Sequence, residues 1–170
     1  MRRQSPQGRS QEAGVTILEV LMATVILTIV ATGLLGPFAI SIGLNKSQGE
    51  LATRTTEYCQ DKMEQLLVLN YTDTTSDTTQ VPTAPTGGTG LSDGGGINPN
   101  SPVANYVDYV ASDGTLQGAN ATGAFYKRVW QISTSGNLKT ITVVTAAIST
   151  GGGVGVTPQT KLVSFLSNMQ

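Results

Sequence analysis

The sequence predicts an α+β fold, in which a long N-terminal α-helix packs on a small antiparallel β-sheet. Three observations support this prediction. Residues 20–45 form a run of 26 residues without a charged side chain. A pattern of apolar residues at helical spacing follows this run without a break, which is typical of an amphipathic helix. After residue 102, short stretches rich in β-branched residues alternate with tight turns, as they do in antiparallel sheets.

The composition excludes most kinds of catalytic centre and metal site. The 170 residues include no histidine, and the only cysteine is Cys59. Ser-His-Asp and Cys-His catalysis, His-ligated metals, four-cysteine zinc sites and an intrachain disulfide are therefore excluded. The 10 Lys and Arg residues against 11 Asp and Glu residues give a net charge of -1, which argues against a basic nucleic-acid-binding patch. We expect no catalytic residue, cofactor, metal or nucleic-acid partner, and we expect Cys59 to pack as a small hydrophobic side chain.

The first 14 residues are polar, and the run that follows them is suited to a membrane. Residues 1–14 contain three arginines and the acid Glu12 without apolar periodicity, so we predict that they are not folded. As a helix, the uncharged run is about 39 Å long, enough to cross a hydrocarbon core of roughly 30 Å. Because the arginines precede it, the N-terminus should stay in the cytoplasm. An apolar membrane-spanning helix is therefore predicted over residues 15–44.

Two simpler explanations of this run are a cleaved secretory signal and a plain signal anchor. A secretory signal has a shorter apolar core and a small-residue cleavage site, whereas this run continues into the amphipathic pattern. A signal anchor fits the length, but it has no need of Glu19, which directly precedes the run. A carboxylate inside a bilayer costs on the order of 2.5 kcal/mol unless it is paired or protonated, although at the membrane interface the cost is small.

Residues 14–20 form the string Gly-Val-Thr-Ile-Leu-Glu-Val, which resembles the processing site of type IV prepilins and type II secretion pseudopilins. The pattern of those families is a Gly, usually a Phe, then Thr and aliphatic residues, and a Glu five places after the cut. The resemblance implies that residues 1–14 are a leader, that a membrane prepilin peptidase cuts after Gly14, and that it methylates the new amine of Val15. Two departures from the pattern are Val15 in place of Phe, and Gln-Glu-Ala at residues 11–13, where a Lys or Arg is more usual.

By this resemblance, Glu19 holds the place of the family's fifth-residue glutamate. Its carboxylate would pair with the Val15 amine of a neighbouring subunit and favour one axial register in a filament. The resemblance implies a minor type IV pilin of the pilus-modification type, a structural subunit and not an enzyme. Its partners would be other pilin subunits, the prepilin peptidase and the inner membrane. It would reside in the inner membrane before assembly and afterwards in a pilus at the cell surface.

Two alternatives to a minor pilin remain open. The first is a type II secretion pseudopilin, which uses the same kind of leader and helix but stays in a periplasmic filament. The second is an uncleaved binding domain anchored to the membrane by a single span. The mass of the mature N-terminus separates the second alternative from both filament proteins, because an intact Met1 indicates an anchor.

Residues 45–170 are predicted to form the head of the protein. We expect an amphipathic helix over residues 45–71, and Pro37 should kink or loosen the helix that leads into it. The loop over residues 72–102 is rich in Thr, Gly, Pro, Ser and Asp, so it should hold no packed element. It is either a disordered surface loop or a binding segment. The apolar stripe expected to cover the sheet consists of Leu44, Leu51, Tyr58, Met63, Leu66 and Leu67.

The antiparallel sheet is predicted within residues 103–170. Strands are expected at residues 106–111, 125–134, 138–148 and 161–166. The Ser-Gly-Asn turn at residues 135–137 should join the middle two strands as a hairpin. Lys127 and Arg128 are adjacent in a strand, so they should point to opposite faces of the sheet and should not form a DNA-binding patch.

Two motifs in the loop suggest chemistry that we do not expect. Residues 90–94, Gly-Leu-Ser-Asp-Gly, match the nucleophile-elbow pattern, but that motif requires a preceding strand, a following helix and a histidine partner. Asp73, Asp77 and Asp93 could supply oxygen ligands to calcium, but they do not match an EF-hand. We expect the first match to be a coincidence and the three carboxylates to be solvated.

Overall fold

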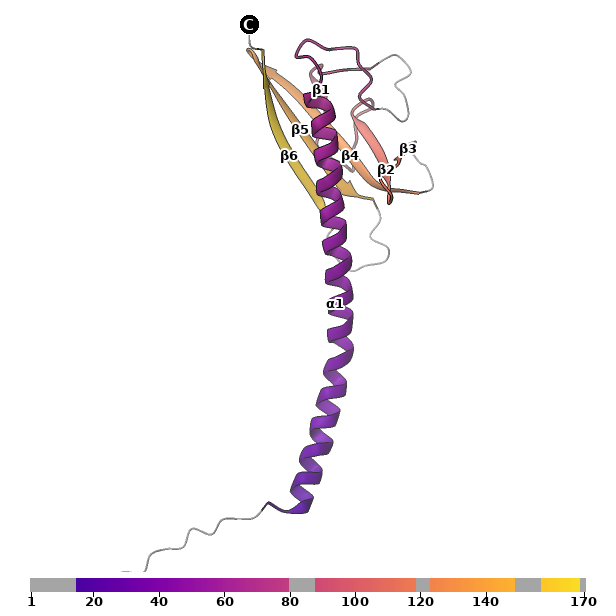
Figure 1. The fold of residues 1–170 in the computed structure, drawn as a ribbon, viewed down its shortest axis with the longest axis vertical. Helices are drawn as coiled ribbons and strands as arrows, with labels where there is room; N and C mark the ends of the chain where they lie inside the picture. Colours follow the sequence, from indigo (N-terminus) through magenta and orange to yellow (C-terminus); the bar gives the residue numbers. More distant parts are fainter. Residues whose placement is uncertain (1–14, 80–87, 119–122, 149–156, 169–170) are drawn as a thin grey trace, which may run out of the picture. The chain divides into compact units, whose positions relative to one another are not determined.

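The computed structural model confirms the α+β fold. It describes residues 15–79, 88–118, 123–148 and 157–168. The helix α1 (Ile17–Leu67) is 51 residues long, and the chain divides into two compact units, Met1–Gly43 and Leu44–Gln170. The second unit contains an antiparallel sheet and the C-terminal part of α1, which packs on that sheet (Figure 1).

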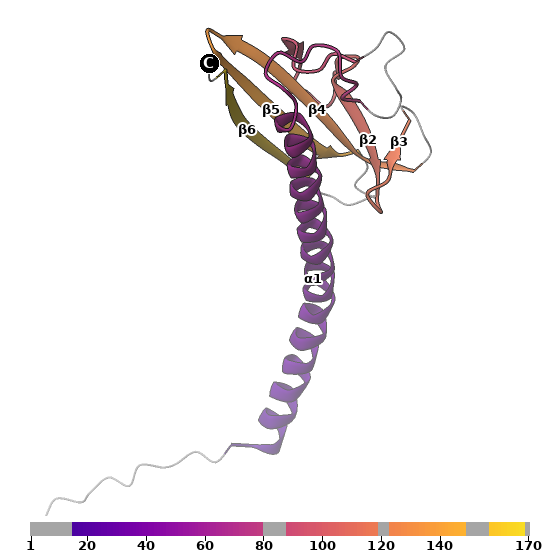
Figure 2. The ribbon, with the colours of Figure 1, turned by 45° about the horizontal axis from the view of Figure 1, so that its top comes forward.

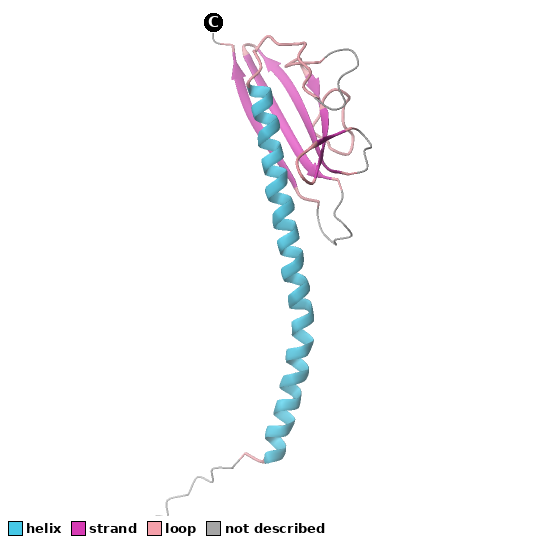
Figure 3. Cartoon of the chain, turned by 45° about the vertical axis from the view of Figure 1, so that its right-hand side comes forward, coloured by secondary structure: helices cyan, strands magenta, loops and turns pink. Residues whose placement is uncertain are grey.

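All strand pairs in the sheet are antiparallel, and the strand order is β3-β2-β4-β5-β6, with β1 paired to β4 beside this path. Figure 2 shows β6 on one side of the sheet and β2 and β3 on the other, and Figure 3 shows the strands as a layer behind the helix. The strands are β1 (Gly94–Gly95), β2 (Val107–Ala111), β3 (Leu116–Gln117), β4 (Ala124–Ser135), β5 (Leu138–Ala147) and β6 (Gln159–Ser167).

The four predicted strands are all present, and their ends differ from the prediction by at most two residues. β4 and β5 form the predicted hairpin, in which Ser135 pairs with Leu138. Gly136 adopts a φ of 59° in the turn, and glycine reaches this left-handed region without the steric penalty of a side chain. The sequence did not predict β1 and β3, because two-residue strands are too short to show an alternating pattern.

The main hydrophobic core lies between α1 and one face of the sheet. Residues of α1 spaced three or four apart meet alternate residues of β4 and β5, as the helical and strand periods require. Cys59 is fully buried in this core, which confirms its predicted packing role. The buried members of the core are Cys59, Met63, Leu66, Leu91, Tyr106, Trp130, Ile132, Ile141 and Val143. A second cluster consists of Tyr58, Val110, Tyr126 and Ala147.

The helix differs from the prediction at its end, at Leu44 and at Pro37. α1 ends at Leu67, not at residue 71, because the side chain of Asn70 accepts hydrogen bonds from the backbone and hydroxyl of Thr72 and so competes with helical bonding. Leu44 is 42% exposed, so the stripe that covers the sheet begins later than predicted. The helix also continues through Pro37, so the predicted loosening is not seen as an interruption of α1.

The prediction that residues 72–102 hold no packed element is wrong for the residues that the structure describes. This segment contains β1, and Leu91 is fully buried in the main core. The amine of Lys139 donates to the carbonyl of Leu91 at 2.5 Å, and the hydroxyl of Tyr106 donates to the carbonyl of Ser92 at 3.2 Å. Lys139 of β5 and Tyr106, which directly precedes β2, therefore fix the position of a loop whose composition did not predict packing. Residues 80–87 lie outside the described part of the chain.

We predict that Leu66→Ala lowers the free energy of unfolding of the head by about 2–5 kcal/mol, because it opens a cavity in the core. Leu66 is fully buried, whereas Leu44 is exposed, so Leu44→Ala is a matched control that should change the stability by less than about 0.5 kcal/mol. Urea unfolding of a fragment that begins at Ile42 measures both effects. Equal unfolding midpoints for the two variants would contradict the packing of α1 on the sheet.

Candidate functional site

The first part of α1 presents an apolar surface to its surroundings. Every residue from 15 to 50 is exposed, and α1 is long and apolar enough to cross a membrane. Exposed apolar surface of this extent is rare on soluble monomers and indicates contact with lipid or with other protein. A signal sequence near an N-terminus has a similar length and composition.

Three threonines within this apolar surface have their hydroxyl groups satisfied by the helix itself. Thr24 donates to the carbonyls of Val20 and Leu21 at 3.0 and 2.9 Å. Thr28 donates to the carbonyl of Thr24 at 2.7 Å, and Thr32 donates to the carbonyl of Thr28 at 2.8 Å. These residues are spaced i, i+4, i+8, so they lie on one face of the helix. Because their polar groups are internally paired, this face is compatible with lipid or with a packed bundle of helices.

The helix begins at a cap formed by Thr16. The backbone N–H of Glu19 donates to the Thr16 hydroxyl at 3.3 Å and to the Thr16 carbonyl at 3.0 Å. Thr-x-x-Glu is the sequence pattern of a capping box, and an acid in the first turn is also favoured by the helix dipole. The sequence analysis missed this cap, although the Thr16-to-Glu19 spacing signals it.

The structure places two of the three predicted site residues. Val15 is 69% exposed and lies two residues before the first residue of α1, and Glu19 is exposed in the first turn of the helix. Gly14 lies outside the described residues. The carboxylate of Glu19 is the only charged group from residue 17 to residue 45. A partner that covers this helix must therefore accommodate one negative charge near its start.

A second feature, which the sequence analysis did not predict, is a buried ionic cluster in the head. It consists of Lys62 of α1, Asp108 of β2 and Arg128 of β4. The Lys62 amine lies 2.7 Å from Asp108 Oδ2, and Arg128 Nη2 lies 2.9 Å from the same oxygen. Asp108 and Arg128 are directly opposite each other in the β2–β4 pair. The side chains of Lys62 and Asp108 are fully buried, and that of Arg128 is 4% exposed.

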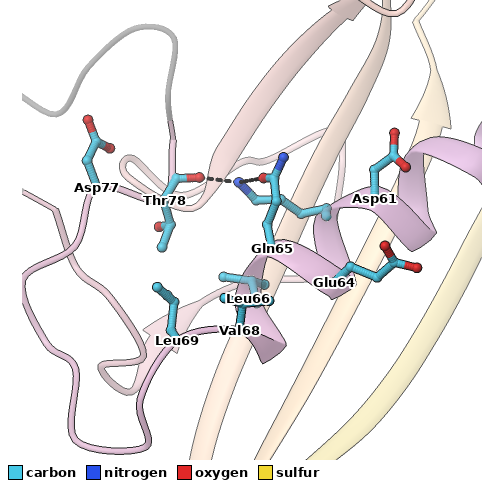
Figure 4. Close-up of a pocket in the computed structure, with 9 residues that line it drawn as sticks. Asp61, Glu64, Gln65, Leu66, Val68, Leu69, Asp77 and Thr78 are labelled. Atoms are coloured by element: carbon cyan, nitrogen blue, oxygen red, sulfur yellow. Dashed lines mark hydrogen bonds between the residues drawn. The ribbon is translucent and has the colours of Figure 1, made fainter.

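The Lys62 amine has three further neighbours besides Asp108. It lies 4.0 Å from the centroid of a Trp130 ring. It also donates to the carbonyl of Thr78 and to the side-chain oxygen of Gln65, and these bonds are the dashed lines in Figure 4. Lys62, Gln65 and Thr78 line a cleft of about 570 Å³ between the end of α1 and the loop that follows it.

Burial perturbs the protonation of this cluster. Desolvation lowers the pKa of the Lys62 amine to about 8, although the Asp108 carboxylate opposes the shift. Desolvation likewise raises the pKa of Asp108 despite its two cationic neighbours. Within the described part of the chain, Asp108 Oδ1 and Arg128 Nε have no hydrogen-bond partner. The cluster is thus a costly arrangement, because ions are removed from water and some of their polar atoms remain unpaired.

Lys127 and Arg128 point to opposite faces of the sheet, as predicted. Arg128 is buried beneath α1, whereas Lys127 is half-buried and donates to the carbonyl of Pro99 at 2.9 Å. The sequence analysis used this alternation only to argue against a basic patch. It missed the consequence that a buried arginine needs a buried acid, for which Asp108 in the neighbouring strand was a candidate.

The loop motifs have structural roles in turns. Among the described residues, no strand directly precedes Ser92, and the two-residue strand β1 follows it in place of a helix, so the nucleophile-elbow match lacks the required elements there. The Ser92 carbonyl accepts a hydrogen bond from Tyr106. Asp73 accepts bonds from Thr75 and Ser76. Asp77 accepts bonds from Thr79, and Asp93 accepts one from Thr134 at 2.5 Å. Asp73 and Asp77 therefore serve separate local turns, and Asp93 joins the loop to β4. The described residues include no group of three acids, histidines or cysteines that could hold a metal.

Comparison with known proteins finds no matching family model, no matching curated protein and no matching solved structure. Two features of the chain itself therefore carry the proposals that follow, the first for its function and the second for a separate chemical step. The first is an apolar, exposed helix with one carboxylate at its start. The second is a head in which a buried ionic cluster connects that same helix to the sheet.

Proposed function

We propose that the protein is a minor type IV pilin, a structural subunit that is cut after Gly14 and assembles through the apolar part of α1 into an extracytoplasmic filament. The observation that most supports this proposal is the exposed apolar surface of residues 15–44, in which Glu19 is the only charge. In a filament, the helices of neighbouring subunits would cover that surface, and the Val15 amine of a neighbour would pair with the Glu19 carboxylate. Lipid of the inner membrane would cover the same surface before assembly.

The proposed pairing explains why a carboxylate precedes a run of 26 uncharged residues. Cutting after Gly14 would create an amine on Val15, which is positively charged near neutral pH. In a water-excluded bundle, this amine and Glu19 of a neighbouring subunit would pair, and only one axial offset would bring them together. A buried ion pair is weak evidence for stability, but it is a plausible device for fixing register. A type II secretion pseudopilin would use the same device in a periplasmic filament.

One observation favours a second candidate, an uncleaved membrane-anchored binding domain. Thr16 caps the first turn of α1 through the backbone N–H of Glu19, and the helix dipole favours a carboxylate in that turn, so an acid at this position has a local reason. An anchor with such a cap would need neither the peptidase nor a neighbouring subunit. The two candidates differ in the fate of residues 1–14, which an anchor keeps and a pilin loses.

We predict that Gly14→Val leaves the leader attached and traps the protein in the inner membrane, because the peptidase recognises the Gly side of the bond. Gly8→Val changes another leader glycine in the same way, and it should be cut normally. Intact mass of the membrane-extracted protein, from cells with a working prepilin peptidase, distinguishes the two forms. If the unaltered protein also retains Met1 in those cells, the chain is an anchor and not a pilin.

A further inference from the structure

The buried contact between Lys62 and Asp108 has the components of an amide-forming site. We propose that Lys62 Nζ and Asp108 Cγ join in an intramolecular amide bond, with loss of one water, and that this bond ties α1 to β2. The amine and the carboxylate oxygen are 2.7 Å apart, and both side chains are fully buried. The proposal rests on this cluster and does not depend on the proposed filament role.

The fold supplies the proximity that such a reaction needs. Lys62 is fixed by the packing of α1, and Asp108 is fixed by the pairing of β2 with β4. Reactants held in this way behave as if at effective concentrations of about 10⁵–10⁸ M. The site excludes solvent from the reacting atoms, yet Lys62 also lines the cleft of about 570 Å³, which gives the released water a way out.

The reaction requires a neutral amine and a neutral carboxylic acid. In water the two groups have widely different pKa values, near 10.5 for a lysine and near 3.8 for an aspartate, so the neutral pair is strongly disfavoured. Here desolvation lowers the pKa of Lys62 and raises the pKa of Asp108, so the transfer of one proton from the ammonium to the carboxylate is far less unfavourable. Asp108 Oδ1 can accept the transferred proton, because it has no hydrogen-bond partner among the described residues.

The bond-forming steps balance without any other reactant. The lone pair of the neutral Lys62 amine attacks Asp108 Cγ, and negative charge develops on Oδ2. Arg128 Nη2, which lies 2.9 Å from that oxygen, stabilises the charge. One hydrogen of the attacking nitrogen then passes to the Oδ1 hydroxyl, the Cγ–Oδ1 bond breaks, and water leaves. An ammonium and a carboxylate have become one amide and one water.

The product also fits the surroundings better than the separate ions do. The amide N–H would donate to the Thr78 carbonyl, and the amide oxygen would accept from Arg128, so both partners are already in place. The oxygen that departs is Oδ1, the atom without a partner. The Lys62 and Asp108 ions and the unpaired oxygen would be replaced by one neutral, hydrogen-bonded group, which removes the penalty of burying those two charges. Arg128 would stay buried and charged, with the amide oxygen in place of the carboxylate as its acceptor.

The test is the intact mass of the purified, folded full-length chain, compared with the same chain carrying Lys62→Arg. We expect the unaltered chain to be lighter than its sequence mass by one water, and the Lys62→Arg chain to have its full sequence mass. After digestion with trypsin, the unaltered chain should yield one branched peptide that joins Lys62 to Asp108. Cleavage after Lys62 should be lost at the same time.

A water can also be lost by backbone cyclisation at Asp-Gly pairs, and the chain has two, Asp93-Gly94 and Asp113-Gly114. The branched peptide and the Lys62→Arg comparison separate these sources. A folded, unaltered chain at its full sequence mass overturns the proposal. So does a water loss that persists in Lys62→Arg, or one that digestion assigns to an Asp-Gly pair. If Lys62→Arg does not fold, the peptide map of the unaltered chain decides alone.

Discussion

Replacing Glu19 with valine should remove the protein from sheared filaments while its amount in the membrane stays unchanged. Membrane insertion should persist, because the change takes a polar group out of an apolar helix. Incorporation into filaments should fail, because the Val15 amine of a neighbour would be left unpaired in an apolar bundle. By analogy with buried pairs broken on one side, the free energy of assembly should become less favourable by about 3–5 kcal/mol.

The Thr16 cap provides the matched control for this experiment. Thr16→Val removes the hydroxyl that accepts the Glu19 N–H but keeps the carboxylate. If Glu19 acts by pairing with a neighbour, Thr16→Val should enter filaments nearly as well as the unaltered protein. Loss of a helix cap costs only about 0.5–2 kcal/mol. Equal filament-to-membrane ratios for Glu19→Val and the unaltered protein would exclude the register role.

Asp108→Ala should lower the free energy of unfolding of the head by at least about 3–5 kcal/mol, because it leaves Lys62 and Arg128 buried without a counter-charge. Both cations lie within hydrogen-bonding distance of the same carboxylate oxygen, Oδ2, so one substitution removes the partner of both. Urea unfolding of the fragment that begins at Ile42 measures the loss.

A variant that replaces all three side chains provides the control for Asp108→Ala. Lys62→Met, Asp108→Leu and Arg128→Met together remove every buried ion of the cluster. Apolar replacement of a whole ionic cluster is often neutral or stabilising, whereas removal of one member is not. The triple variant should therefore be more stable than Asp108→Ala alone. If Asp108→Ala unfolds at the same urea concentration as the unaltered fragment, the cluster is not buried as described.

The periodic elements could be predicted from the sequence, because their signals are local. The uncharged run and the apolar stripe at helical spacing gave α1, and β-branched alternation with a Ser-Gly-Asn turn gave the β4–β5 hairpin. The end of α1 was misplaced because the competing signal is a single side chain, that of Asn70. The composition of residues 72–102 also led to a wrong prediction of an unpacked loop. Burial of the single side chain of Leu91, with the hydrogen bond from Lys139 to its carbonyl, fixes this segment although most of its residues are small and polar.

The ionic cluster could not be predicted, because its members meet only through the tertiary fold. Lys62 lies between Asp61 and Glu64 in the sequence, so it cannot be distinguished there from a lysine on the solvated surface of a helix. Its burial depends on which face of α1 packs on the sheet. Its pairing with Asp108 depends in addition on the β2–β4 register. By contrast, the segment from Gly14 to Glu19 was singled out by its resemblance to prepilin processing sites, and its role stays a prediction to which the structure adds the Thr16 cap.

The N-terminal peptide of the protein in a sheared-filament fraction is the most direct test of the proposed function. Peptide mass spectrometry of that fraction should find a chain that begins at Val15 with a methylated amine, and it should find no peptide from residues 1–14. A chain that begins at Met1 and is recovered only with membranes, from cells whose prepilin peptidase is active, would contradict the proposal.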